Sequence, residues 1–155
     1  MKLAIITDTH FGARNDNLNF NEYFYKFYDN VFFPTMKERG ITTCVHMGDV
    51  TDRRKYISYR IANDFRERFV NRFKEMNIDL HIMIGNHDRM VMRKGFESQI
   101  PKRWIKSYNE VLGTPNWKWV ENIVYDDVLY EHGEGGQAQM KAKNNMMSSV
   151  CGHTH

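Results

Sequence analysis

The sequence predicts an α/β fold in which a mixed, largely parallel sheet, or a pair of such sheets, is flanked by helices. Three observations support this prediction. Apolar runs of strand length recur along the chain, segments with helical periodicity separate the first three runs, and each run ends in a polar turn of the same kind. A chain of 155 residues has the size of one domain, so we expect a single domain over residues 1–155.

Five apolar runs are predicted as strands because each has strand length and is bounded by polar residues. In chain order they are KLAIITD (2–8), ITTCVHMGD (41–49), IDLHIMIGN (78–86), DVLYEHG (127–133) and SSVCGH (148–153). Because strand–helix–strand units form right-handed parallel crossovers, we expect the first three strands to run parallel.

Two helices are predicted between the first three strands, each from apolar residues at helical spacing. In the first helix these are Phe20, Phe24, Phe27, Tyr28 and Val31, and in the second they are Ile61, Phe65, Phe69, Phe73 and Met76. Ser58 is a predicted N-cap of the second helix, whereas Pro34 is expected to kink the first helix or to end it early. We expect the aromatic series of the first helix to be core, with Tyr23 and Tyr25 as the only candidates for base stacking.

The last third of the chain is expected to hold shorter elements. Residues 96–116 show a short helical pattern around Trp104, and residues 117–125 alternate like a strand around a turn at Glu121 and Asn122. A final short helix is predicted over residues 137–146, with its lysines exposed.

The composition is that of an ordinary globular protein, with 41% hydrophobic and 26% charged residues, which excludes a disordered or collagen-like chain. The apolar runs are too short to span a bilayer, and no signal segment opens the chain, so we expect a cytoplasmic protein without membrane contact. Cys44 and Cys151 each lie in a short apolar run. We interpret both as small buried strand residues rather than as a disulfide or a catalytic thiol.

The charge is unevenly distributed. Residues 53–103 hold 13 Lys and Arg against 6 Asp and Glu, whereas the rest of the chain holds 9 against 13. A basic middle segment fits a polyanionic substrate, although solvated helix faces produce the same composition.

Polar side chains follow every predicted strand at the point where the strand ends. Because ligands of parallel α/β sheets bind outside the carboxyl ends of the strands, we expect these turns to converge on one crevice. The side chains that would meet there are Asp8, His10, Asp49, Asn86, His132, His153 and His155. Seven such groups are too many for one zinc ion, but they suit two divalent ions that share a bridging carboxylate. Two neighbouring ions form a clamp for attack on phosphorus.

The polar turns closely resemble the motifs of the calcineurin-like metallophosphoesterase superfamily. The motifs read DTH at 8–10, GDVTD at 48–52, GNHD at 85–88, HG at 132–133 and GHTH at 152–155, in the order of the family. The resemblance covers the whole chain and implies the fold predicted above.

The resemblance also implies a role for each side chain. One metal ion would be held by Asp8, His10, Asp49 and His155, and the other by Asp49, Asn86, His132 and His153. His87 would protonate the leaving oxygen, and Asp88 would orient the His87 ring. Family members use manganese, iron or zinc, and we expect two Mn²⁺ ions.

Different parts of the chain resemble different branches of the superfamily. Residues 1–88 are most similar to the exonuclease subunits of double-strand-break repair, which act on DNA with a partner ATPase, whereas the last third is closer to small phage-type and bacterial phosphoesterases. In the family, further strands follow the G-H-x-H turn, and the repair nucleases add a cap. We therefore expect either a fragment of a longer protein or a reduced version, and we favour the fragment.

The leading functional hypothesis is a phosphodiesterase that degrades DNA from its ends. The alternative is a phosphomonoesterase, because phosphatases of the superfamily carry Asp-Arg where this chain has Asp52-Arg53. A third hypothesis is a catalytically impaired metal-binding subunit. Arg53, Arg54 and Arg89 are candidates for substrate binding, with a solvated loop as the equal alternative. His46 and His81 lie inside strands and are expected to be core or sheet-face residues.

Overall fold

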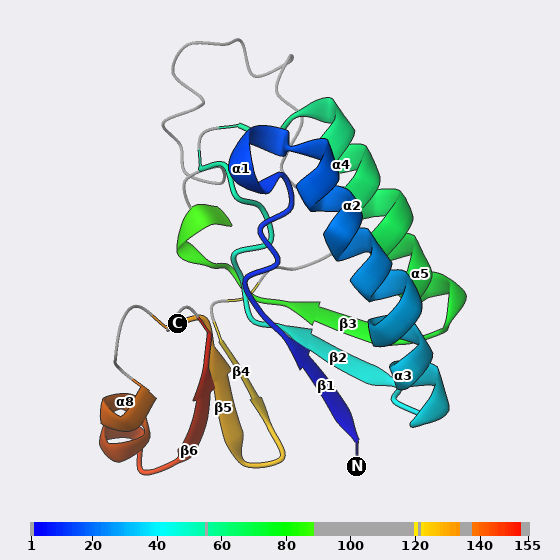
Figure 1. The fold of residues 1–155 in the computed structure, drawn as a ribbon. Helices are drawn as coiled ribbons and strands as arrows, with labels where there is room; N and C mark the ends of the chain where they lie inside the picture. Colours follow the sequence, from blue (N-terminus) through cyan, green and yellow to red (C-terminus); the bar gives the residue numbers. More distant parts are fainter. Residues whose placement is uncertain (1, 55, 89–119, 121, 134–137, 153–155) are drawn as a thin grey trace, which may run out of the picture.

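The computed structural model describes residues 2–54, 56–88, 120, 122–133 and 138–152. These residues form two three-stranded sheets, with the long helices on the outer face of one sheet and a short helix beside the other (Figure 1). The predicted α/β class is confirmed. In the described part of the chain, none of the helices has the length and hydropathy that a membrane-spanning segment needs.

The first sheet is parallel, as predicted. It contains β1 (Leu3–Ile6), β2 (Thr43–His46) and β3 (Asp79–Ile82) in that spatial order. Ile6 pairs with His46, and His46 pairs with Ile82, so the three strands end at the same level. The loops that follow them therefore begin side by side.

Two long helical segments cover this sheet. The first consists of α2 (Leu18–Phe27), a π-helical stretch (Tyr28–Phe32) and α3 (Phe33–Glu38). The second consists of α4 (Tyr59–Phe65), a π-helical stretch (Arg66–Val70) and α5 (Asn71–Glu75). The N-cap prediction for Ser58 is confirmed, because its hydroxyl accepts a hydrogen bond from the Ile61 amide. Asn17 caps α2 in the same way.

Pro34 does not end the first helix early, because the helix continues through it to Glu38; the alternative expectation, a kink, stays a prediction. The adjustment is a π turn, in which the Phe33 amide donates to the Tyr28 carbonyl five residues earlier. Pro34 lies in the first turn of α3, directly after this π turn, whose altered hydrogen bonding accommodates a residue without an amide proton.

The buried face of the first helix also differs from the prediction. Phe27 and Val31 are 43% and 51% exposed, whereas Tyr25 is 3% exposed. Aromatic residues occupy several sides of α2, so their spacing alone does not identify the buried side of the helix. After the π turn, Phe33 lies on the buried side. In the second helix the predicted positions from Ile61 to Phe73 are buried, as expected.

The second sheet is mixed. It contains β4 (Asn122–Tyr125), β5 (Val128–Glu131) and β6 (Ser148–Cys151), with β4 antiparallel and β6 parallel to β5. The turn expected at residues 121–122 was wrong, because Asn122 already pairs with Glu131. The hairpin turns instead at Asp126 and Asp127, whose φ angles of 53° and 59° suit a tight two-residue loop.

The short helix α8 (Ala138–Asn145) precedes β6 close to the predicted position. The four-residue segment α1 (Ala13–Asp16), between β1 and α2, contains residues with left-handed φ/ψ angles, so it is a tight turn rather than a regular helix. The expected helical pattern at residues 96–116 lies outside the described residues, as do 117–119 of the expected strand.

Two hydrophobic cores lie on opposite faces of the parallel sheet. Cys44 belongs to the core beneath the helices, whereas Val45 and Met47 belong to the core shared with the second sheet, which includes Tyr130. Burial on both faces accounts for the uninterrupted apolar runs. Cys44 is buried in β2, as expected, whereas Cys151 in β6 is only half-buried, and its thiol donates to Glu131 Oε1 at 3.5 Å.

Candidate metal centre

The loops after β1 and β2 run side by side beyond the end of the sheet. The amides of Asp8 and His10 donate to the carbonyls of Gly48 and Asp49, each at 3.1 Å, and the Phe11 amide donates to the Val50 carbonyl at 2.8 Å. This backbone ladder fixes the two loops against each other. The side chains between its rungs therefore have defined directions.

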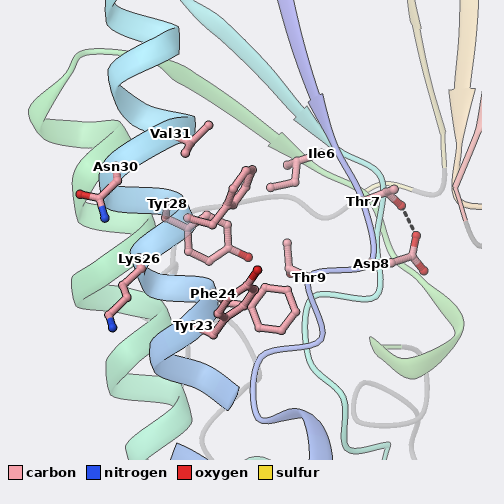
Figure 2. Close-up of a pocket in the computed structure, with 11 residues that line it drawn as sticks. Ile6, Thr7, Asp8, Thr9, Tyr23, Phe24, Lys26, Tyr28, Asn30 and Val31 are labelled. Carbon is pink, nitrogen blue, oxygen red and sulfur yellow. Dashed lines mark hydrogen bonds between the residues drawn. The ribbon is translucent and has the colours of Figure 1, made fainter. Parts of the chain in front are cut away.

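The backbone is strained where the polar side chains leave it. Asp8, His10 and Asp49 have φ angles of 52°, 42° and 53°, in the left-handed region that costs free energy for residues other than glycine. In a regular strand Asp8 would share a face with Ile6. Figure 2 instead shows Ile6 pointing towards the helical layer and Asp8 pointing away from it, with its carboxylate accepting a hydrogen bond from Thr7.

Two glycines allow the loops after β2 and β3 to approach closely. A Cβ atom on Gly85 would lie 2.1 Å from the amide nitrogen of Asp49 and 2.2 Å from its Oδ1. A Cβ atom on Gly48, whose φ is 99°, would lie 2.6 Å from the amide nitrogen of Gly85. Any larger residue at either position would push the Asp49 carboxylate away from the loop after β3.

The loops bring together two groups of potential ligands. Asp8, Asp49 and His132 form one group, and His10, Asp49 and His87 form the other; within each group the ligand atoms lie within 4.8 Å of one another. Asp49 is common to both groups. Its Oδ1 lies 3.4 Å from His132 Nε2, and its Oδ2 lies 4.0 Å from His10 Nε2, so the carboxylate faces both sides.

His132 is oriented as a metal ligand would be. Its Nδ1 donates to the Met47 carbonyl at 2.8 Å, which turns Nε2 towards Asp49 Oδ1 and towards Asn86 Oδ1 at 2.9 Å. Nε2 thus faces two oxygen acceptors, and this arrangement would be stabilised either by a cation or by a second ring proton on Nε2. Burial alone would lower the pKa of His132, but its hydrogen bond to Asp49 raises it. The residues present therefore fit a divalent cation.

The charge of Asp49 is retained despite burial. Burial works to raise its pKa, but hydrogen bonds from His132 and from the His87 amide outweigh this and lower the pKa to about 2. His10 shows the opposite balance, since burial and then the neighbouring His87 lower its pKa. A neutral imidazole beside an ionised carboxylate is the donor set that zinc, manganese and iron share. The Asp52 carboxylate lies 3.7 Å from His10 Nδ1, on the far side of the ring.

His87 lies at the edge of the centre, with its ring at 4.7 Å from that of His10. Its Nδ1 donates to the Asp52 carbonyl, and the Arg54 guanidinium donates to its Nε2 at 3.0 Å. Because a guanidinium only donates, Nε2 is the acceptor in this contact. Arg54 thus occupies the outer side of His87.

Asp88, which the resemblance implies as the partner that orients the His87 ring, contacts backbone amides of two loops. Its fully buried carboxylate accepts from the amides of Val50 at 3.3 Å and Gly85 at 3.0 Å, while the His87 ring contacts the Asp52 carbonyl. These contacts favour Asp88 as a link between the loops after β2 and β3. Arg53 also points elsewhere, because it binds Asp16 at 3.3 Å.

Sequence reasoning missed a buried link between the first two loops. The Gly48 amide donates to His46 Nδ1 at 3.1 Å, so His46 Nε2 carries the ring proton and donates to the Thr9 hydroxyl at 2.9 Å. Thr9 in turn donates to the Val50 carbonyl at 3.1 Å. Burial lowers the pKa of His46 to about 3 and keeps the ring neutral. The signal in the sequence was a histidine inside an apolar strand three positions before Asp49.

The structure brings most of the predicted site residues together. These are Asp8, His10, Asp49, Asn86, His87, Asp88 and His132. His153, His155 and Arg89 lie outside the described residues. Gly152, the last residue that the structure describes, lies beside the centre, since a Cβ atom on it would lie 2.4 Å from Thr7 Oγ1 and 3.5 Å from His132 Nδ1.

Comparison with known proteins agrees with this geometry. A stretch of 52 residues is 38% identical to exonuclease subunit 1 of Enterobacteria phage T4, and it represents 34% of this chain and 15% of that protein. The similarity therefore spans a small part of the phage protein. The sequence model of the family described as calcineurin-like phosphoesterase matches residues 1–155. The chain belongs to the calcineurin-like phosphoesterase family.

Proposed function

We propose that this chain hydrolyses phosphodiester bonds in nucleic acid, with DNA ends as the substrate and two divalent ions, Mn²⁺ in preference to iron or zinc, as cofactors. The observation that carries the proposal is the carboxylate of Asp49. It faces His132 on one side and His10 on the other, so that two cations held by these groups would share it. Its pKa of about 2 keeps it charged at neutral pH.

The ligand sets that we propose share Asp49. Asp8, His10, Asp49 and His155 would hold one ion, and Asp49, Asn86, His132 and His153 the other. Such a pair of ions activates water and neutralises phosphate oxygens. The chain itself fixes the direction of each donor, because His132 is held by the Met47 carbonyl and the Asp8 carboxylate by Thr7.

We assign the leaving-group proton to His87. Its Nδ1 is held by the Asp52 carbonyl, so Nε2 is the atom available to a substrate; it lies 3.9 Å from Asp49 Oδ2, and Arg54 contacts it. A bound phosphate would attract the Arg54 guanidinium. The released Nε2 would then take up a proton from solvent, and it would donate that proton to the leaving oxygen. Asp88 would act through the loops that it joins rather than on the ring.

A nucleic-acid substrate is supported by two observations. The similar phage protein is named as an exonuclease subunit. Moreover, Arg53 is engaged by Asp16 and Tyr56, which weakens the argument that Asp52-Arg53 forms the phosphate clamp of a phosphatase. A cytoplasmic location and a partner ATPase belong to the same proposal.

The experiment that tests this proposal is digestion of end-labelled single- and double-stranded DNA in Mn²⁺. We expect nucleotide release by the chain and its loss in His87→Ala. His81→Ala is the matched control, because His81 is an exposed histidine on β3 outside the centre. Equal release by both variants would contradict the role of His87.

Two other outcomes would change the proposed activity. Hydrolysis of p-nitrophenyl phosphate without any release from DNA would favour the phosphomonoesterase. Tight binding of two Mn²⁺ ions without hydrolysis of any phosphoester would favour the catalytically impaired subunit.

A further inference from the structure

An exposed surface of arginines and tyrosines begins at the rim of the proposed centre. It lies on the loop between β2 and α4 and on the first turn of α4. Tyr59 is 88% exposed and Tyr56 is 49% exposed, values that no packing role requires. The Arg53 guanidinium lies over the Tyr56 ring at 4.7 Å from its centroid. Arg54, in the same loop, contacts His87 at 3.0 Å.

This surface continues onto the segment before α2. Arg53 binds the Asp16 carboxylate at 3.3 Å, and Arg60 donates to the Asp16 carbonyl, so both arginines are fixed beside α1. Beyond α1 lies an open groove of about 460 Å³, lined by Arg14, Asn17, Asn19, Phe20 and Tyr23.

The groove contains the same kinds of side chain as the loop between β2 and α4, an arginine over an aromatic ring and an exposed tyrosine. The Arg14 guanidinium lies over the Phe20 ring at 5.1 Å from its centroid, and Tyr23 is 73% exposed. Tyr23 therefore remains a candidate for base stacking, whereas Tyr25 does not, because it is buried and donates to Asp64.

Other arginines of the basic middle segment have a structural use. Arg68 pairs with Glu22 at 3.4 Å and Arg72 pairs with Asp29 at 3.1 Å, which joins the two long helical segments, while Arg66 pairs with Glu67 at 3.0 Å. The excess of positive charge in residues 53–103 is therefore partly neutralised along the helices. Near the centre, Arg53 is likewise paired with Asp16 at 3.3 Å, but its guanidinium also lies over the exposed Tyr56 ring. Arg54 contacts His87, and Arg60 contacts the Asp16 carbonyl rather than a carboxylate.

The apolar cleft on the neighbouring face has a different character. It has a volume of about 550 Å³ and lies between α2 and the end of β1, on the side away from the Asp8 carboxylate (Figure 2). Its lining is mostly apolar, so it offers little to a polyanion. The arginine–tyrosine surface is thus the one of the two that matches a nucleic acid.

We propose that Arg14, Tyr23, Arg53, Tyr56, Tyr59 and Arg60 form a track that binds the single-stranded end of the nucleic-acid substrate. Arg14 and Arg60 would contact the backbone phosphates, Arg53 would hold the Tyr56 ring in place, and the exposed rings would stack on bases without regard to sequence. Bases inside a duplex are not open to such stacking, so the track selects single strands. The inference deepens the proposed function and rests on it for the reaction, but the binding step is separate.

The test is binding of a fluorescent oligothymidylate, followed by anisotropy in Mn²⁺, with His87→Ala present in every protein so that the strand is not consumed. Tyr59→Ala should weaken binding about fivefold or more, since one stacked base contributes about 1–3 kcal/mol. Tyr59→Trp should restore it. Arg60→Gln should lower the slope of binding against salt concentration. Lys74→Gln, an exposed cation on α5, is the control expected to bind as before.

Two results would overturn the track. One is unchanged oligothymidylate binding in the double variant Tyr56→Ala/Tyr59→Ala. The other is an equal loss of binding to single strands and to a blunt duplex, since stacking requires open bases.

Failure of the track and failure of the proposed function are distinguishable. Hydrolysis of bis(p-nitrophenyl) phosphate by the unmodified chain reports on the centre alone. Hydrolysis of this ester combined with binding that ignores Tyr59 removes the track and keeps the function. Binding that depends on Tyr59 with no hydrolysis of any ester keeps the track and removes the function.

Discussion

The two ends of β2 show how differently one strand is used. Cys44, near its start, packs under the helices in a core dominated by Phe65, Phe69 and Phe73, with backbones in ordinary helical and extended conformations. The loop beyond its carboxyl end holds Gly48 and Asp49 with positive φ, and Asp49 carries a buried charge. The apolar core stabilises the fold, and that stability lets the loops hold a conformation they would not adopt alone.

We therefore expect substitutions in the aromatic core and substitutions in the loops beyond β2 to affect different properties of the protein. Substitutions in the aromatic core should lower the free energy of unfolding and leave metal affinity of the folded protein intact. Substitutions among the loops should remove metal binding with a smaller effect on stability. The variants below are ordered from the largest expected effect to the smallest.

The largest effect is expected for Asp49→Asn. Loss of the shared carboxylate should weaken binding of both Mn²⁺ ions and lower hydrolysis by about a thousandfold or more, because metal ions contribute several kcal/mol to transition-state stabilisation. Calorimetric titration with Mn²⁺ measures the binding, and Asp79→Asn, an exposed carboxylate on β3, is the control. Retention of one ion with wild-type affinity would show that Asp49 does not bridge the two.

The matching change in the core is Phe69→Ala. Phe69 is fully buried and lies 5.0 Å from Phe73 and 5.5 Å from Phe65 between ring centroids. Its removal should cost about 3–5 kcal/mol of unfolding free energy, measured by urea denaturation. Mn²⁺ affinity below the transition should stay unchanged. A parallel loss of affinity would mean that core and centre are not separable.

Thr9→Val tests whether the buried contact between Thr9 and His46 couples stability to metal binding. The substitution keeps the shape but leaves the buried His46 Nε2–H without its acceptor, which should cost about 1–3 kcal/mol of stability. It should also weaken Mn²⁺ binding several-fold, since Thr9 stands between Asp8 and His10. Thr9→Ser keeps the hydroxyl and should restore both properties. Restored stability without restored binding would limit Thr9 to a packing role.

His46 also predicts a pH dependence. Burial lowers its folded-state pKa to about 3, so below the unfolded-state pKa of about 6.5 the unfolded chain binds a proton that the folded chain does not. Its contribution to stability is therefore complete above pH 6.5 and falls by about 1.4 kcal/mol per pH unit as the pH decreases towards 3. The difference in unfolding free energy between the wild type and His46→Gln, measured across this range, should show that slope. A flat difference would contradict a neutral buried ring.

The sequence predicts the location of the centre better than its internal contacts. Parallel topology alone places Asp8, Asp49 and Asn86 at one edge of the sheet. The three strands end at the same level, so the residues that follow them lie close together. The directions of Arg53 and Asp88 depend instead on tertiary partners, Asp16 for one and the Gly85 amide for the other. Sequence spacing holds no information on those partners.

The same limit explains the misassigned helix face. A π turn adds one residue to a helical turn, so the residues beyond it no longer follow the spacing of about 3.6 residues from which the buried face was predicted. The hairpin turn at Asp126 was missed for a related reason, since two aspartates favour a tight turn less clearly than a glycine would.

The smallest effect is expected for Asn77→Gly, which serves as a reference for the backbone strain at Asp8. Asn77 follows α5 with a φ of 52°, the same value as Asp8, but its amide donates to Lys74 in an ordinary helix-ending turn. Asn77→Gly should therefore change stability by a few tenths of a kcal/mol, since glycine adopts this conformation freely while the unfolded chain gains entropy. Asp8→Gly relieves the same backbone strain, so the apo protein should keep its thermal midpoint while Mn²⁺ binding is lost. If Asp8→Gly instead lowers the midpoint far more than Asn77→Gly, the Asp8 carboxylate stabilises the fold as well as the proposed metal site.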